Sequence, residues 1–152
     1  MSEDLDTPFA EIECNLPPTD PGGIVAVRPT AEIITRQHLP SFVGISAATA
    51  GAKGISMNLV LIPPGGAAIP HFHRGFETAI YIIKGRVETR YGPGLMHSTI
   101  NQAGDFLYIP ADLPHQPINL SKSEPALAIV SRNDPNEQES VVHYQPGDET
   151  EA

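Results

Sequence analysis

Three histidines and one glutamate have the types and the spacing that could hold a metal ion. His71 and His73 are two residues apart, Glu77 follows four residues after His73, and His115 lies farther along the chain. Side chains two residues apart on a β-strand point to the same face, so the imidazoles of His71 and His73 can converge on one ion. Imidazole nitrogens and carboxylate oxygens bind divalent transition metals at about 2.0–2.2 Å. The sequence therefore predicts a mononuclear metal centre.

Strands must position these side chains, and the rest of the chain favours them. Short runs rich in β-branched and aliphatic residues recur between breaks rich in proline and glycine. They cover residues 23–27, 31–35, 56–62, 78–83, 86–91, 105–109, 126–130 and 141–144. The 16 prolines and 13 glycines leave no room for a long helix, and we expect at most a turn or two around residues 39–48. Many short strands about 8–12 residues apart predict an all-β, antiparallel sandwich or barrel.

Two segments of the chain resemble the paired motifs of the cupin superfamily. The first motif is a glycine, a His-x-His pair, a glutamate and a second glycine, and it is matched by Gly65, His71, His73, Glu77 and Gly85. The second motif is matched by Gly104, Pro110, His115 and Asn119, with Asp112 where a glycine is usual. The resemblance covers roughly residues 55–131.

The resemblance implies both a fold and a ligand set. The fold is the antiparallel double-stranded β-helix, a jelly-roll-like cupin barrel. The ligand set is one divalent metal ion near the barrel axis, held by His71, His73, Glu77 and His115. Three imidazoles and a carboxylate suit Fe, Mn, Ni, Cu, Co or Zn and leave positions open for water or substrate.

The position of Glu77 departs from the family pattern. Seven residues separate Glu77 from Gly85 where six are usual, and counting back from Gly85 leads to Thr78 instead. Facing alternates along a strand, so Glu77 would then point out of the barrel. A β-bulge or a shorter loop after His73 would restore its direction. We expect Glu77 to be the fourth ligand and the catalytic residue, with a three-histidine site as the alternative.

Three neighbouring residues are candidates for the substrate pocket. Phe72 is expected to wall the site. Arg74 could steer an anionic substrate toward the metal or simply be a solvated loop residue. Tyr81 could line the pocket, although Ile80 and Ile82 compete for the inward face. The isolated histidines lack paired spacing and are not expected to be ligands; they are His38, His97 and His143.

Length and composition indicate one domain. The chain has 152 residues, of which 40% are hydrophobic, enough to bury a core without disulfides. The predicted organisation is an acidic, proline-rich arm over residues 1–22, the cupin barrel over residues 23–145, and a flexible tail over residues 146–152.

Charge and cysteine content limit the partners and the compartment. Nine basic and 18 acidic side chains give a net charge of −9, which repels nucleic acids and anionic lipids. Cys14 is the single cysteine, which excludes an internal disulfide and a cysteine-based zinc site and suits a reducing compartment. The acidic start of the sequence does not resemble a signal peptide, and no apolar run is long enough to span a bilayer. We expect a cytoplasmic protein with no nucleic-acid or membrane partner.

The function that these features favour is a metal-dependent enzyme acting on a small organic substrate, dioxygenase-like and therefore an oxidoreductase. A redox-inactive cyclase, isomerase or lyase with the same ligands is an alternative, and so is a binding or sensing module without turnover. The resemblance also implies a homodimer formed through the outer sheet, with residues 1–35 contributing.

Overall fold

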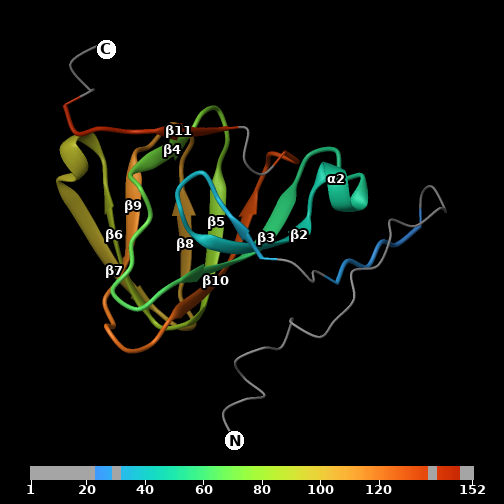
Figure 1. Ribbon diagram of the computed structural model, residues 1–152. Helices are drawn as coiled ribbons and strands as arrows, with labels where there is room; N and C mark the ends of the chain where they lie inside the picture. Colours follow the sequence, from blue (N-terminus) through green and yellow to red (C-terminus); the bar gives the residue numbers. More distant parts are fainter. Residues whose placement is uncertain (1–22, 29–31, 137–139, 148–152) are drawn as a thin grey trace, which may run out of the picture.

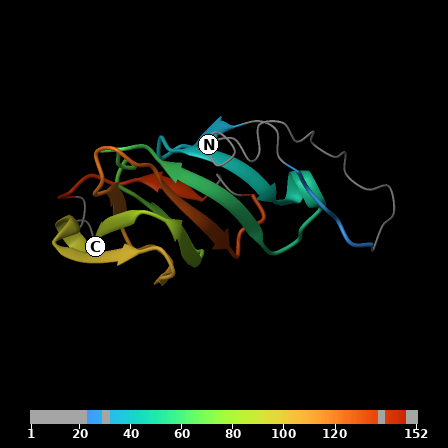
Figure 2. The same cartoon turned by 90° about the horizontal axis from the view of Figure 1, so that it is seen from below.

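Two antiparallel β-sheets face each other across one core, as Figures 1 and 2 show from two directions. The computed structural model describes residues 23–28, 32–136 and 140–147. The predicted arm over residues 1–22 and the predicted tail from residue 148 onward lie outside these residues. The six-stranded sheet has the order β1 (Ile33–Ile34), β2 (Pro40–Ile45), β3 (Ser56–Ile62), β10 (Ala126–Arg132), β5 (Thr78–Lys84) and β8 (Phe106–Ile109). The five-stranded sheet has the order β11 (Val141–His143), β4 (His71–His73), β9 (His115–Asn119), β6 (Arg86–Tyr91) and β7 (His97–Gln102).

The predicted all-β fold is confirmed, and the helical content is very small. In the part of the chain that the structure describes, the helices are α2 (Ala47–Ala50) and the 3₁₀ turn η1 (Pro93–Leu95). Ser46 caps α2 through a hydrogen bond from the backbone N–H of Thr49, and Gly51 ends it at φ 69°. No helix among the described residues is long and apolar enough to cross a membrane. The cytoplasmic location stays a prediction.

Most of the expected strands form close to their predicted bounds. The runs at 56–62 and 86–91 become β3 and β6 over the same residues. The run at 23–27 was expected to be a strand but forms none, and the Ile24 side chain is 99% exposed. Strands β2 and β7 were not predicted. β7 reads HSTINQ and buries none of its side chains fully, so its identity as a strand comes from backbone pairing with β6.

The core lies between the sheets, nearer to one end of the barrel. Alternate residues of β3, β5 and β10 face inward in register: Ile62 lies opposite Ala126, and Ile82 lies opposite Ala128. The buried cluster consists of Leu39, Ile62, Ala68, Ile82, Val87 and Ala126. The inward positions at the other end of the same strands carry polar residues, among them Asn58, Thr78 and Arg132. This polar end faces the histidines.

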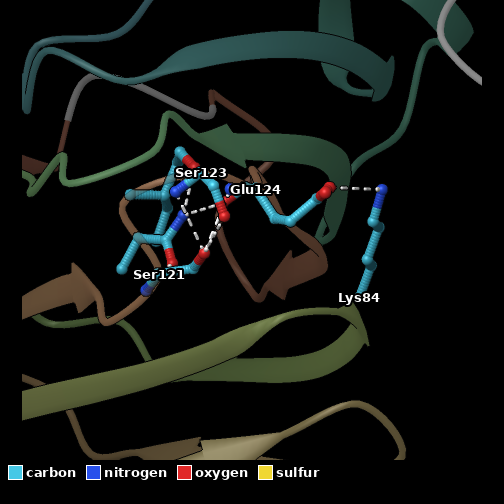
Figure 3. Close-up of polar contacts among 6 residues, drawn as sticks. Lys84, Ser121, Ser123 and Glu124 are labelled. Atoms are coloured by element: carbon cyan, nitrogen blue, oxygen red, sulfur yellow. Dashed lines mark hydrogen bonds and ion pairs between the residues drawn. The ribbon is translucent and has the colours of Figure 1, made fainter.

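A network of side chains holds the connection from β9 to β10 at the apolar end of the barrel. The amide nitrogen of Asn119, Nδ2, lies 2.8 to 3.2 Å from the carbonyl oxygens of Ile62, Pro63 and Glu124. Figure 3 shows the turn that follows, where Ser121 Oγ accepts hydrogen bonds from the backbone N–H groups of Ser123 and Glu124. Asn119 is therefore a structural residue, distant from the histidine end of β9.

Candidate metal centre

Strands β4 and β9 bring the three predicted histidines together. His71 and His73 alternate with outward-facing Phe72 on β4, and the register of β4 against β9 places His71 directly opposite His115. The ring centroids of His71 and His115 are 4.4 Å apart, and those of His71 and His73 are 5.1 Å apart. One ring nitrogen from each of the three lies within 4.8 Å of the other two, and all three residues are buried. The group could hold a metal ion.

Hydrogen bonds orient the rings so that lone pairs meet inside the barrel. The Nδ1 atom of His71 lies 2.6 Å from the Ile69 carbonyl oxygen, and that of His115 lies 2.9 Å from the Leu113 carbonyl oxygen. A carbonyl oxygen only accepts, so each Nδ1 carries the proton and each Nε2 keeps its lone pair. The Nε2 atom of His73 is buried and has no hydrogen-bond partner. An unsatisfied buried nitrogen beside two lone pairs fits a bound cation.

Burial keeps the three imidazoles neutral, as metal ligands must be. Desolvation lowers the pKa of His71 to about 3 and that of His115 to about 4. The pKa of His73 is also lowered, first by desolvation and then by the positive charge of Arg132. The imidazoles therefore need no deprotonation to bind a metal at neutral pH.

The structure does not bring Glu77 into the group, which corrects its expected role as ligand and catalytic residue. Glu77 is exposed, and its Oε1 atom accepts a 2.6 Å hydrogen bond from the Tyr108 hydroxyl. Among the described residues, the group that could hold the metal contains three histidines and no acid. Thr78 is the buried, inward residue at this point of β5. Four residues separate Thr78 from His73 and six separate it from Gly85, so the family spacing selects Thr78 and strand alternation turns Glu77 outward.

Arg132 occupies the place beside Thr78. The two residues are opposite each other on β10 and β5, and Arg132 Nε donates a 2.9 Å hydrogen bond to Thr78 Oγ1. The Arg132 side chain is buried and lines the same cavity as the histidines. Arg132 was not predicted to be a site residue. The alternation of Ala126, Ala128 and Val130 along β10 could have predicted that Arg132 points inward.

The three expected pocket residues lie outside the cavity, which corrects that expectation too. Arg74 is exposed, with its guanidinium carbon 5.6 Å from the ring centroid of Phe72 on the outer side of β4. Tyr81 packs on Phe106 with ring centroids 4.7 Å apart. Ile80 and Ile82 hold the inward positions of β5 instead.

A cavity of about 80 Å³ runs from the histidines toward the apolar core. Its polar end is lined by His71, His73, His115, Thr78, Arg132, Gln37 and Asn58. Its apolar end is lined by residues of the core cluster, including Ile62, Ile82 and Val87. Gln37 Oε1 and Asn58 Oδ1 are buried and have no hydrogen-bond partner. Neither amide was predicted to line the site, because neither stands near a sequence motif.

The isolated histidines and Asp112 have other contacts. His97 stacks on Tyr91, and His143 Nε2 contacts the Arg36 carbonyl oxygen, so neither belongs to the histidine group. Asp112 has φ 66°, in the left-handed region where a glycine is usual. Its Oδ1 atom accepts a hydrogen bond from the Gly75 N–H, which links the His115 turn to the loop after His73.

Comparisons with known proteins agree with this geometry. Residues 58–132 match the family model "Cupin domain". Germin-like protein 3-5 of Oryza sativa subsp. japonica is 31% identical over 120 residues, which cover 76% of this chain and 50% of that protein. The chain therefore spans about half the length of this curated relative.

Solved structures show the same fold at lower identity. The oxalate decarboxylase of Lactobacillus farciminis, solved as a formate complex, has a TM-score of 0.63 and 22% identity over 74% of this chain and 33% of that chain. A double-stranded β-helix protein from Klebsiella pneumoniae has a TM-score of 0.59 and 16% identity over 73% of this chain and 88% of that chain. The motif spacing, the two facing sheets, the inward histidines and these comparisons together establish that the chain belongs to the cupin superfamily.

Proposed function

We propose that His71, His73 and His115 bind one divalent metal ion and that the protein is a metal-dependent enzyme acting on a small organic substrate. The observation that carries the proposal is the buried, unpartnered Nε2 atom of His73, facing two imidazoles whose protons are held on the opposite nitrogen. Iron, manganese, nickel, copper, cobalt and zinc all accept such a set of imidazoles. Iron, manganese and copper would supply the dioxygenase-like, oxidoreductase chemistry that we favour.

The chain's own residues contribute orientation and exclusion of water. The carbonyl groups of Ile69 and Leu113 fix the ring tautomers of His71 and His115. When bound, the metal would supply Lewis acidity and an open coordination position. The cavity beside it is small, with polar groups at the histidine end and aliphatic side chains at the other. These features select a compact substrate with one polar end.

A redox-inactive cyclase, isomerase or lyase is the second candidate, together with a binding or sensing protein without turnover. The observation that favours the non-catalytic reading is the lining of the cavity, which contains no aspartate or glutamate among the described residues. Glu77, the expected general base, is exposed and hydrogen-bonded to Tyr108. A reaction that needs a carboxylate base would have to obtain it from elsewhere.

Elemental analysis tests the metal proposal directly. The protein should be purified without added metal or chelator, and a second portion should be stripped and reloaded with Fe(II), Mn(II) or Zn(II). About one equivalent of metal per chain, lost in a His71→Ala variant, is the expected result. Oxygen uptake by the iron-loaded protein with small phenols or acids then separates an oxygenase from the redox-inactive alternatives. No binding of any of these metals would contradict the proposal.

We also propose that two copies associate through the outer face of the six-stranded sheet. This face exposes Tyr81, Ile83, Phe106 and Tyr108, and the Phe106 side chain is 80% exposed. Apolar side chains gathered on one sheet face are typical of protein interfaces. Light scattering coupled to gel filtration should give twice the mass of one chain, and Phe106→Ser should lower it. A monomer mass for the full chain would contradict the proposal.

A further inference from the structure

Two buried amide side chains in the cavity of the three histidines have an oxygen atom without a hydrogen-bond partner. They are Gln37, through Oε1, and Asn58, through Oδ1, and the two residues are 7% and 6% exposed. The hydroxyl groups of Thr35, Ser41 and Thr78 belong to the same lining, and each of them has a hydrogen-bond partner within the protein. Buried polar groups normally have a partner, so the two amide oxygens point to one that comes from outside the protein.

The backbone holds Gln37 beside the metal centre. Its carbonyl oxygen accepts a 2.9 Å hydrogen bond from the Ile69 N–H, and the Ile69 carbonyl oxygen lies 2.6 Å from His71 Nδ1. The turn that carries Gln37 is closed by two hydrogen bonds between Thr35 and Leu39, one to the Thr35 hydroxyl and one to the Leu39 carbonyl oxygen. Ile69 therefore holds the Gln37 backbone and orients the His71 ring at the same time.

Asn58 reaches the cavity from the six-stranded sheet. On β3 and β10 it lies opposite Val130, one inward position away from the pair formed by Ser56 and Arg132. The next residue of β3 that lines the cavity is Val60, which is apolar. Asn58 thus stands at the boundary between the polar end and the apolar end of the cavity.

The unpaired oxygen atoms require a hydrogen-bond donor that carries no charge. An amide oxygen offers lone pairs and no proton, so a carboxylate, which has no donor at neutral pH, would leave both oxygens unpaired. An ammonium group would donate, but it would face the positive guanidinium of Arg132 in the same cavity. A neutral hydroxyl group meets the requirement, because it donates one hydrogen bond without bringing a charge.

The size of the cavity limits the ligand to a few atoms. A dry protein cavity of about 150 Å³ holds one benzene molecule. The cavity here is about 80 Å³, which leaves room for about three or four non-hydrogen atoms by the same measure. A diol on two adjacent carbons has this size and offers two donors, one for each amide oxygen.

We propose that Gln37 and Asn58 form a subsite that binds a small neutral alcohol, whose hydroxyl groups donate hydrogen bonds to the two amide oxygens. The substrate of the three-histidine centre is then a small hydroxylated compound. This inference rests on the proposed function for the role of the metal, but the subsite itself consists of protein groups only.

The test compares ethylene glycol with 2-fluoroethanol, in which a fluorine atom of similar size replaces one hydroxyl group. The metal-free protein is titrated with each, and the side-chain amide signals of Gln37 and Asn58 are followed by nuclear magnetic resonance. Ethylene glycol should bind about three- to tenfold more tightly, the worth of one net hydrogen bond. Equal binding of the two alcohols, tighter binding of acetate than of ethylene glycol, or no shift of these signals would overturn the proposal.

Apolar variants of similar shape separate this role from a structural one. Gln37→Met and Asn58→Leu each remove one acceptor and should weaken ethylene glycol binding about three- to tenfold. Neither should lower the unfolding temperature of the ligand-free protein, because the lost oxygen atom had no hydrogen bond. Unchanged affinity for ethylene glycol in both variants, or a marked loss of stability in both, would refute the assignment.

Gln116→Met is the matched control. Gln116 follows His115 in the sequence but does not line the cavity, and its Nε2 atom donates a 3.1 Å hydrogen bond to the Ala68 carbonyl oxygen. This variant should lose stability and bind ethylene glycol as the unaltered protein does. A similar loss of affinity in Gln116→Met would show that the effect is not specific to the subsite and would overturn the assignment.

The metal content of the same samples distinguishes this inference from the proposed function. Preference for ethylene glycol in a protein that takes up no metal would support the subsite and contradict the metal centre. One equivalent of metal together with equal binding of the two alcohols would support the metal centre and overturn the subsite. Loss of metal in Gln37→Met or Asn58→Leu would show that an amide oxygen is itself a metal ligand, and would also overturn the subsite.

Discussion

The carboxylate of Glu77 accepts a 2.6 Å hydrogen bond from the Tyr108 hydroxyl on the outer face of the six-stranded sheet. Tyr108 lies opposite Ala79 on the neighbouring strand, so Glu77 and Tyr108 meet beyond the end of β5 and away from the histidines. Thr78, the next residue, points inward and accepts a hydrogen bond from Arg132. Side chains alternate in direction along a strand, so a shift of one residue decides whether an acidic side chain here points to the histidines or to solvent.

Glu77→Gln is expected to leave the metal content unchanged. The Glu77 carboxylate raises the pKa of Tyr108 through the hydrogen bond that it accepts, so the substitution should lower that pKa toward its ordinary value. Elemental analysis gives the first result, and an ultraviolet titration of the tyrosines gives the second. Loss of metal in this variant would show that Glu77 turns inward and acts as a ligand after all.

His71→Ala and His115→Ala are each expected to reduce the metal content at least tenfold. Each removes one of three converging imidazoles, and the remaining pair is a much weaker site. His97→Ala is the matched control, since His97 stacks on Tyr91 outside the group. Circular dichroism should show the same β-structure in all three variants. Full metal retention in either of the first two would refute the ligand assignment.

The metal-free protein is expected to lose stability as the pH falls below about 6.5. In the unfolded chain the histidines take up protons near that pH, while burial lowers the folded pKa of His71 to about 3 and that of His115 to about 4. Stability is thus fully present above pH 6.5 and falls until the folded groups also titrate. Each histidine can contribute up to about 1.4 kcal/mol per pH unit in this window. Urea unfolding at pH 7.5, 6 and 5 measures the slope, and a flat profile would contradict the burial argument.

Asn119→Ala is expected to destabilise the fold by about 2–4 kcal/mol. The Asn119 amide nitrogen lies within hydrogen-bond distance of three carbonyl oxygens, and its Oδ1 atom accepts from the Ser121 N–H. Removing the side chain leaves several buried groups without partners. Asn101→Ala is the comparison, because Asn101 is half-buried and makes weaker side-chain contacts. Equal unfolding midpoints in denaturant for the two variants would contradict a structural role for Asn119.

Alanine substitutions at two glycines distinguish the cost of backbone strain from the cost of steric overlap. Gly85 and Gly104 have φ values of 98° and 97°, so alanine is similarly strained at both. A Cβ at Gly85 would lie 2.9 Å from the Ala126 Cα, whereas a Cβ at Gly104 would have no atom within 4 Å. Gly85→Ala should therefore cost about 1–3 kcal/mol more than Gly104→Ala, because the new Cβ would overlap Ala126 at the start of β10. Thermal unfolding of both variants measures it, and equal costs would mean that the contact relaxes freely.

Much of this protein was predictable from the order of its residues. The His-x-His pair, the third histidine and the two glycine-anchored motifs predicted the cupin fold and the three residues that converge. This succeeded because the period of two along a strand is a local property, which places His71 and His73 on one face whatever surrounds them. Strands made of short apolar or β-branched runs between turn residues, such as β3 and β6, were predicted because strand preference is also a local property.

Tertiary structure decided the features that depend on pairing between distant segments. The segment β7 is a strand only because β6 pairs with it. The run at 23–27 forms no strand, because no described strand pairs with it. Which of Glu77 and Thr78 points into the barrel depended on the register of β5 in its sheet. Arg132 lies at the site only because β10 pairs with β3 on one side and with β5 on the other. Local spacing in the sequence thus determined which histidines converge, while the register of the sheets determined that Arg132, and not Glu77, is the charged residue beside them.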